Sequence, residues 1–263
     1  MLTTSAPAPS PPPTTPLGKV VAKYHVYVGH KLDTLTGQVT NLRTAVAAGH
    51  RTEAQRRWLV CQVTWQQVGA AYGSFGAAGT AINGLASGLP QGVASAMFTG
   101  LHRIEYGLYN NEDLTQLVAH VDQLASDVSD LITNLGTTAI TPTDMPIRCH
   151  EILEDALRDH LSGQDDYGSG MAYALTSGDV AGTRVVLQEL KPLIPSPVLG
   201  QSAYDKSKAA LDILDAALLA SKVANQWPDY PTLTKHQRQP VNGAIGGALE
   251  ALYQVPFVLG KLT

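Results

Sequence analysis

The chain has 263 residues, a formal net charge of −4 and only 15% charged residues. This length allows one large domain or two small ones with a substantial core. The slight negative charge leaves no basic footprint for nucleic acid and no polybasic patch for a membrane surface. No run approaches about 18 uninterrupted apolar residues, so we expect no transmembrane segment.

Residues 1–16, MLTTSAPAPSPPPTTP, form a Pro/Ser/Thr-rich tract. Such a composition cannot build a core, so we expect a disordered tail. Tracts of this kind often tether a secreted or lipid-anchored domain, although no signal peptide is visible here. If Met1 follows a removed signal sequence, the protein is extracytoplasmic, in the cell envelope. If Met1 is the native start, the alternative is a cytoplasmic protein.

Apolar residues recur at steps of three and four through the first half of the chain, which predicts helices. The first helix covers about residues 17–48. A second runs to about residue 74 and is opened by a capping box of Thr52 and Gln55. The Gly-rich residues 75–92 predict a long connection. A third helix carries ASAMFTGLHRIEYGLY, and a fourth, opened by Asp113, runs to about residue 135.

The segment GTTAITPTDMP at 136–146 is the natural midpoint of the chain. Beyond it we expect a helix from residue 147, a short helix in MAYALTSGD, another in VAGTRVVLQELKPLI, and helices at 203–225 and 235–259. The last is opened by a capping box of Thr234 and Gln237. No alternation of period two predicts strands. The fold class is therefore all-α: tandem, pseudo-symmetric four-helix bundles forming one elongated domain, with halves 17–135 and 147–263.

The segment GLHRIE is the best candidate for chemistry. His102 and Glu105 lie three residues apart, so on a helix they share one face and can reach the same ion. Imidazole nitrogen and carboxylate oxygen bind zinc, iron and manganese. A buried, ionised glutamate is costly unless it is paired or bound to a metal. Gly100 and Gly107 beside them would allow close approach of another backbone. The alternative is a polar pair on a helix.

The segment FTGLHRIEYGLY resembles the GxHxxE motif of the imelysin-like family, which includes EfeO-type iron-uptake proteins. YHVYVGHKLDTL, RCHEILEDALRDHLSGQDDYGSG and VAGTRVVLQELKPLI resemble further family segments in the same order. The resemblance covers about residues 20–259. It implies a double four-helix bundle with a metal site between helices, holding an ion that is usually iron, in the periplasm or cell envelope. His102 and Glu105 match the motif and carry over as metal ligands.

The resemblance fails at four positions. Iron-uptake members tend to carry carboxylates along the second helix and in the following loop. The matching residues here are neutral: Gln66, Gly69, Gly79 and Asn83. Other residues must therefore complete the coordination sphere, or the metal role is altered or lost.

His150 and Glu154 are the first candidates to replace the missing ligands. They lie four residues apart and share a helix face. If the halves pack about a pseudo-twofold axis, this pair could face His102 and Glu105. Two histidines and two carboxylates would suit Fe(II), zinc or manganese. The alternative is that His150 caps a helix start or packs there.

The remaining polar residues are weaker candidates. Cys61 and Cys149 could form a disulfide or remain buried thiols, and a thiolate in the site would favour copper or zinc. GQDDYGSG, with Asp165 and Asp166, lacks EF-hand spacing and predicts a turn that could line the cleft. His160, like the other histidines near helix ends or on polar faces, is explained by helix-terminus contacts.

These observations lead to three functional hypotheses. The first is an imelysin-like protein that captures iron, or zinc, copper or manganese, in the cell envelope and works with a membrane permease or other uptake components. The second is a metal-dependent enzyme, a peptidase-like hydrolase or an oxygen-using oxidase, at the same His/Glu site. The chain lacks HExxH, GxSxG and P-loop motifs, so no catalytic residue is assigned. The third is an interaction domain that keeps only the fold.

Overall fold

The computed structural model describes residues 15–197 and 200–260 and confirms an all-α fold. Within these residues there is no β-strand, only an isolated bridge between Val223 and Gln226. The α-helices are α1 (Pro16–Ala47), α2 (Arg51–Gln66), α3 (Tyr72–Asn83), α4 (Gly100–Tyr109), α5 (Leu114–Asn134), α6 (Met145–Asp155), α7 (Ala172–Leu190), α8 (Ala203–Ala220) and α9 (Lys235–Leu259). The expected disordered tail falls almost entirely on residues outside the described part.

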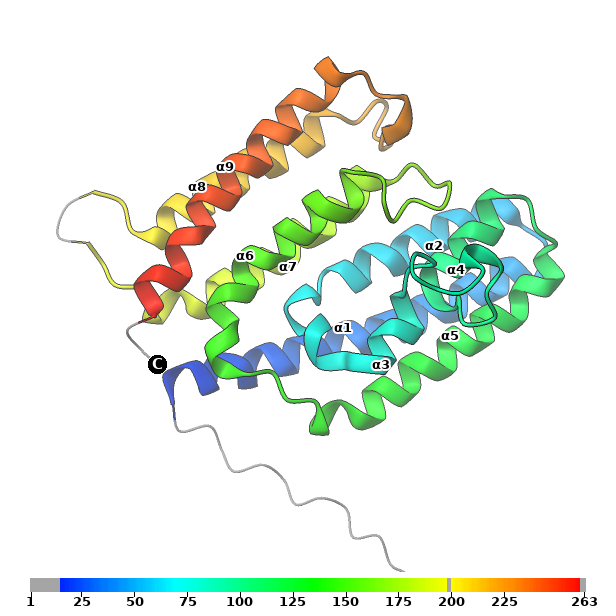
Figure 1. The fold of residues 1–263 in the computed structure, drawn as a ribbon, viewed down its shortest axis with the longest axis horizontal. Coiled ribbons are helices and arrows are strands. Elements are labelled where there is room, and N and C mark those ends of the chain that lie inside the picture. The colour runs from blue at the N-terminus through cyan, green and yellow to red at the C-terminus, as the bar shows by residue number, and fades with distance from the viewer. Residues whose placement is uncertain (1–14, 198–199, 261–263) are drawn as a thin grey trace, which may run out of the picture.

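The first half is a bundle of α1, α2, α4 and α5, with α3 packed against α4 and α5 (Figure 1). The two long helices α1 and α5 supply about half of its buried apolar residues, because their apolar residues repeat at helical spacing. On α5 the buried stripe is Leu114, Leu117, Val121, Leu124, Val128 and Leu131, as the sequence predicted. The buried stripe of α1 likewise runs from Val20 to Val46.

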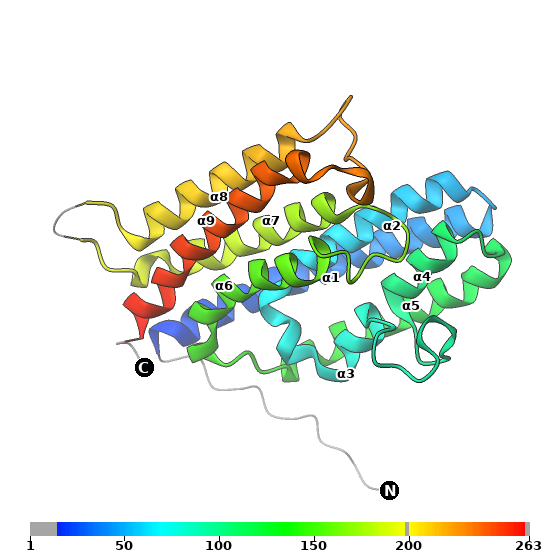
Figure 2. The same ribbon diagram turned by 45° about the horizontal axis from the view of Figure 1, so that its top comes forward.

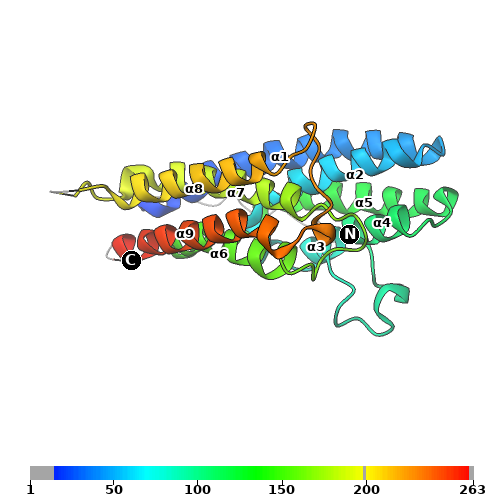
Figure 3. The same ribbon diagram turned by 90° about the horizontal axis from the view of Figure 1, so that it is seen from above.

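The second half is a bundle in which α6 packs on α7 and α9, and α8 packs on α7 and α9. Figures 1 and 2 show the two bundles side by side in one elongated molecule, with α6–α9 on one side and α1–α5 on the other. Figure 3 shows the same arrangement from above. In the described part, no helix has both the length and the apolar character needed to cross a membrane.

The two bundles meet along α2 and α7, with α1 also touching α7. Two glycines of α7 make this contact possible. A Cβ atom added at Gly178 would lie 2.8 Å from the carbonyl oxygen of Val63, and one added at Gly182 would lie 2.7 Å from that of Gln67. Real Cβ atoms do not approach so closely, so α7 packs directly on the backbone of the first half.

Several expected boundaries are wrong. The second helix ends at Gln66 rather than near residue 74, and part of the expected 75–92 connection is helix α3. Helix α2 begins after His50, so Thr52 lies inside the helix and forms no capping box. The two helices expected on either side of residue 180 are one helix, α7. The capping box of Thr234 and Gln237 is present and opens α9.

Candidate functional site

Helix α4 carries the GLHRIE segment and is held tightly against its neighbours. Its first residue, Gly100, has φ +75°, and an added Cβ would lie 2.2 Å from the carbonyl oxygen of Ile82. Only glycine fits there. The indole nitrogen of Trp58 on α2 donates a 2.9 Å hydrogen bond to the carbonyl of Leu101, and the Thr99 hydroxyl donates one to the carbonyl of Ala81. These contacts fix the position of His102 in the core.

His102 and Glu105 form a buried pair one helical turn apart. Both side chains are 1% exposed, and His102 Nδ1 lies 3.0 Å from Glu105 Oε2. The other carboxylate oxygen, Oε1, accepts hydrogen bonds from the backbone nitrogens of Tyr167 at 3.1 Å and Ser169 at 3.3 Å. Burial raises the pKa of Glu105, although its bonds to His102 and Ser169 lower it in part. Glu105 therefore orients the imidazole and ties α4 to a loop of the second half.

His102 lines a polar pocket of about 130 Å³ between the two halves. The pocket is formed by residues of α2, α3, α4, α6 and α7 and of the loops between them: Gln66, Gly69, Tyr72, Asn83, Leu85, His102, Ile152, Asp155, Arg158, Asp159, His160, Asp165 and Asp179. Glu105 is not among these residues. With Nδ1 engaged by Glu105, the nitrogen that His102 can offer the pocket is Nε2.

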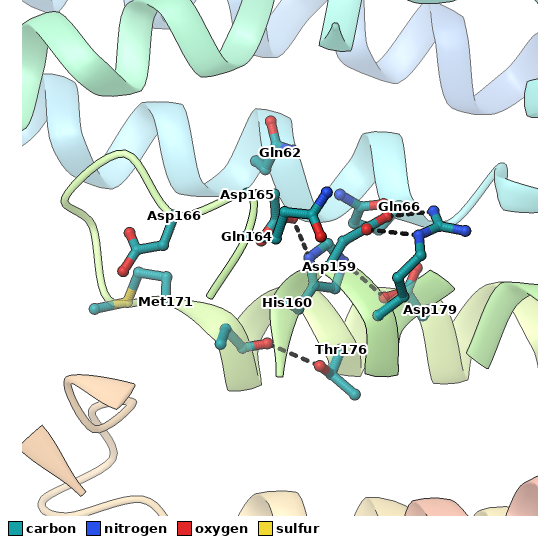
Figure 4. Close-up of polar contacts among 12 residues, drawn as sticks. Gln62, Gln66, Asp159, His160, Gln164, Asp165, Asp166, Met171, Thr176 and Asp179 are labelled. Atoms are coloured by element: carbon teal, nitrogen blue, oxygen red, sulfur yellow. Dashed lines mark hydrogen bonds and ion pairs between the residues drawn. The ribbon is translucent and has the colours of Figure 1, made fainter. Parts of the chain in front are cut away.

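The wall contributed by the second half is built on a π-helical turn, Ala156–His160, that continues α6. The buried imidazole of His160 bridges two buried aspartates, with Nδ1 bonded to Asp165 and Nε2 at 3.0 Å from Asp179 Oδ2 (Figure 4). Burial lowers the pKa of His160, but the two aspartates raise it well above its usual value. Burial raises the pKa of Asp179 to about 6, against the lowering effect of His160.

A second ion-paired group lies at the rim of the pocket. Arg158 lies 2.7 Å from Asp155 and donates a 2.7 Å bond from Nε to Asp159. The lining thus contains four aspartates against Arg158 and His160. This excess of carboxylates favours a cation in the pocket. Among the described residues, no three His, Cys, Asp or Glu side chains are already arranged around a common metal position.

The four neutral residues at which the family resemblance fails lie at this pocket or next to it. Gln66, Gly69 and Asn83 line it, and Gly79 lines an adjoining cleft together with Asn83. Gln66 accepts a bond from the hydroxyl of Tyr72, and Asn83 accepts one from Gln62. The first-half wall of the pocket therefore carries no carboxylate, and its metal-ligating side chain is that of His102.

His150 and Glu154 lie elsewhere on α6. They approach each other at 3.4 Å, Glu154 is 53% exposed, and the His150 ring packs edge-on against Tyr253 of α9. Neither residue lines the pocket, whereas Ile152 does. His150 is two residues from Ile152, roughly 200° around the helix. The structure therefore brings His102 to Glu105 and His150 to Glu154 but does not bring the two pairs to one pocket, and a metal role for the second pair stays a prediction.

The sequence interpretation missed His160, Asp179 and the role of Arg158. One signal was present: Asp179 is the only acidic or basic residue in the apolar run MAYALTSGDVAG. A carboxylate in such a run needs a partner. The predicted turn at Asp165 does line the pocket. Cys61 and Cys149 are free and buried and do not line it.

Comparisons with known proteins match most of this chain in sequence. The family model of Imelysin (Peptidase M75) matches residues 20–240. The chain is 26% identical to the iron uptake system component EfeM of Pseudomonas syringae, over 94% of this chain and 87% of the relative. It is 23% identical to EfeO, also an iron uptake system component, of Escherichia coli and of Yersinia pestis. These matches cover 93% and 96% of this chain but only 64% and 67% of the relatives.

Proposed function

This chain belongs to the imelysin family, and on that premise we propose that it captures iron in the pocket between its two halves, with His102 as a protein ligand. The observation that carries the proposal is the buried His102–Glu105 pair at the pocket wall. Histidines that bind metals commonly donate their other ring N–H to a carboxylate, which fixes the tautomer and raises the basicity of the ligand nitrogen. Here Glu105 is the carboxylate that contacts Nδ1 of His102, and Nε2 remains to bind the ion.

The types of ligand atom in the pocket are ones that bind iron. Imidazole nitrogen and carboxylate oxygen both bind iron, and also zinc, copper and manganese. The pocket offers His102 and, across from it, the carboxylates of Asp155, Asp165 and Asp179. These carboxylates already hold Arg158 and His160, so a cation must compete with those ion pairs for them. Glu105 acts as a positioning residue in this proposal, because both of its oxygens are engaged.

Two relatives of different length, EfeM and EfeO, are named components of iron uptake systems. We extend that role to this chain as one component among several: it would hold iron in the cell envelope and pass it to a membrane permease or another uptake component. The relatives from Escherichia coli are longer than this chain, so the activity of the whole uptake protein is part of the proposal. Fractionation of cells expressing the full native gene tests the location.

The direct test is metal content and affinity. Purified wild-type protein, His102→Ala and the matched control His236→Ala, which changes an exposed histidine, are compared by elemental analysis and by equilibrium dialysis against ferrous and ferric iron. We expect the wild type and His236→Ala to bind iron and His102→Ala to lose most of it. Circular dichroism checks that each variant is folded. Equal, negligible iron in all three proteins would refute the proposal.

A further inference from the structure

A wider cleft adjoins the polar pocket. It has a volume of about 550 Å³ and shares Tyr72, Asn83 and Leu85 with the pocket. Sites for small organic ligands are typically about 300–1,000 Å³, far more than a single ion occupies. The cleft therefore has room for a small organic molecule. It shares lining residues with the pocket in which we propose that iron binds.

The cleft has a neutral lining. Its floor includes the stacked rings of Trp65 and Tyr72, whose centroids are 5.3 Å apart. Polar side chains reach it from Thr80, Asn83 and Ser87, and none of the described residues that line it is charged. A lining of aromatic rings with a few hydroxyl and amide groups is typical of sites for small organic molecules.

Glycines set the backbone conformation around the cleft. Gly76 has φ +53° and Gly88 has φ +86°, conformations that side chains rarely adopt. At Gly84 an added Cβ would lie 2.5 Å from the carbonyl oxygen of Thr80. The backbone around the cleft thus depends on residues without side chains.

Most of the polar side chains that line the pocket already have hydrogen-bond or ion-pair partners, so few ligand atoms are free to bind an ion. Both ring nitrogens of His160 contact aspartates, and Arg158 holds Asp155 and Asp159. Gln66 and Asn83 are bonded to Tyr72 and Gln62. His102 supplies one nitrogen. An iron ion that arrives with its own oxygen ligands needs only that nitrogen and leaves the ion pairs intact.

We propose that the cargo enters as a small chelate, in which iron is held by an oxygen-donor organic ligand such as a hydroxycarboxylate or a catecholate. The ion binds His102 Nε2 in the polar pocket, and the organic part occupies the adjoining cleft over Trp65 and Tyr72. The nitrogen replaces one oxygen donor or water on the ion, and no electron is transferred. This inference rests on the proposed iron-binding function and names the form in which iron is taken.

The first experiment measures what is bound together with iron. The protein is dialysed against radiolabelled ferric citrate carrying a second label on citrate, against ferric catecholate labelled in the same way, and anaerobically against ferrous iron alone. We expect organic label to be retained with iron in at least one chelate arm, and tighter binding of that chelate than of ferrous iron alone. Comparison of the citrate and catecholate arms identifies the preferred oxygen donor.

The second experiment fills the cleft. Thr80→Trp places a large ring in the cleft from an exposed position on α3, and Ala77→Trp places the same ring on an exposed position of α3 that does not line the cleft. We expect Thr80→Trp to weaken chelate binding by at least about tenfold, a loss of about 1.4 kcal/mol. The same variant should leave binding of ferrous iron alone unchanged, and Ala77→Trp should match the wild type in both assays.

The outcomes separate the two proposals. Iron retained without any organic label, or chelate binding that Thr80→Trp does not weaken, would overturn the chelate inference and leave iron capture standing. Failure to bind iron in any arm would overturn the proposed function and the inference with it. Loss of binding in Ala77→Trp as well as in Thr80→Trp would also count against the cleft, because only one of the two positions lines it.

Discussion

Replacing Glu105 with glutamine tests how the buried pair works, because the two possible orientations of the new amide differ sharply in energy. With its carbonyl oxygen in the place of Oε1, the substituted side chain keeps both backbone bonds to Tyr167 and Ser169 and turns its NH₂ group toward His102 Nδ1. The reverse orientation leaves two backbone donors, one buried and one partly buried, without an acceptor, at about 1–3 kcal/mol each. The first orientation is therefore favoured by roughly 2–6 kcal/mol.

The consequence for His102 follows from hydrogen-bond rules. An NH₂ group at Nδ1 requires that nitrogen to be an acceptor, so the imidazole proton moves to Nε2 and blocks the lone pair that faces the pocket. Loss of such an orienting carboxylate typically costs about 10–100-fold in metal affinity. We expect Glu105→Gln to remain folded and to bind iron about 10–100-fold more weakly. Glu105→Ala, which leaves three buried or partly buried donors without an acceptor, should lose roughly 3 kcal/mol or more of stability.

Three measurements check this. Nitrogen NMR of the histidine rings reports the tautomer, equilibrium dialysis gives the iron affinity, and urea denaturation gives the free energy of unfolding. Glu112→Gln is the control, because Glu112 forms a partly exposed pair with Arg103 at 2.8 Å and should matter little to iron. A folded Glu105→Gln variant with wild-type affinity, or with its proton still on Nδ1, would refute the reasoning.

Three further predictions concern stability and reactivity. The pKa of folded His160 lies well above 6.5, so its stabilising contribution is complete below that pH and is lost as the pH rises through the folded value. Urea denaturation across alkaline pH should show this decline, and His160→Gln should flatten it; an unchanged slope would contradict the ion pairing. Gly182→Ala should lower the melting temperature, with a cost of about 1–3 kcal/mol, because the added Cβ meets a carbonyl oxygen at 2.7 Å. Gly243→Ala, with no atom within 4 Å of its new Cβ, should not destabilise, and equal effects would count against close packing of α7. Burial raises the pKa of Cys61 to about 12 and also raises that of Cys149, so neither thiol should react with Ellman's reagent until urea unfolds the protein. Rapid reaction of either thiol in the native protein would show that this cysteine is not buried.

The long amphipathic helices could be predicted because their signal is local. Helix α5 has six apolar residues on one stripe, and α9 begins and ends at the predicted residues. Helix α3 was missed because glycines hide its pattern. Its buried residues, Phe75 and Ile82, are only two and lie seven residues apart, and Gly76 breaks the helical backbone between them.

The same difference between local and long-range signals decided which site residues could be predicted. Spacing within one helix was enough to pair His102 with Glu105. His160 and Asp179 come from different segments, and the π-helical turn Ala156–His160 shifts the register of the helix, so a regular helical wheel does not place His160 correctly. Whether His150 lines the pocket depends on which side of α6 faces the other bundle, and no pattern within α6 decides that.

The contact between α2 and α7 bears on how the iron that we propose as cargo would enter and leave. Binding proteins that close like a hinge need few contacts across the joint, so that two lobes can swing. Here Gly178 and Gly182 bring one bundle onto the backbone of the other, and Glu105 ties α4 to the loop before α7. These contacts oppose a hinge-like rotation of one bundle against the other. We expect the rates of uptake and release to be set by the 84–99 and 161–171 loops, which meet through a 2.7 Å bond from the Ala86 nitrogen to the Tyr167 hydroxyl and through the packing of Phe98 on the Tyr167 ring.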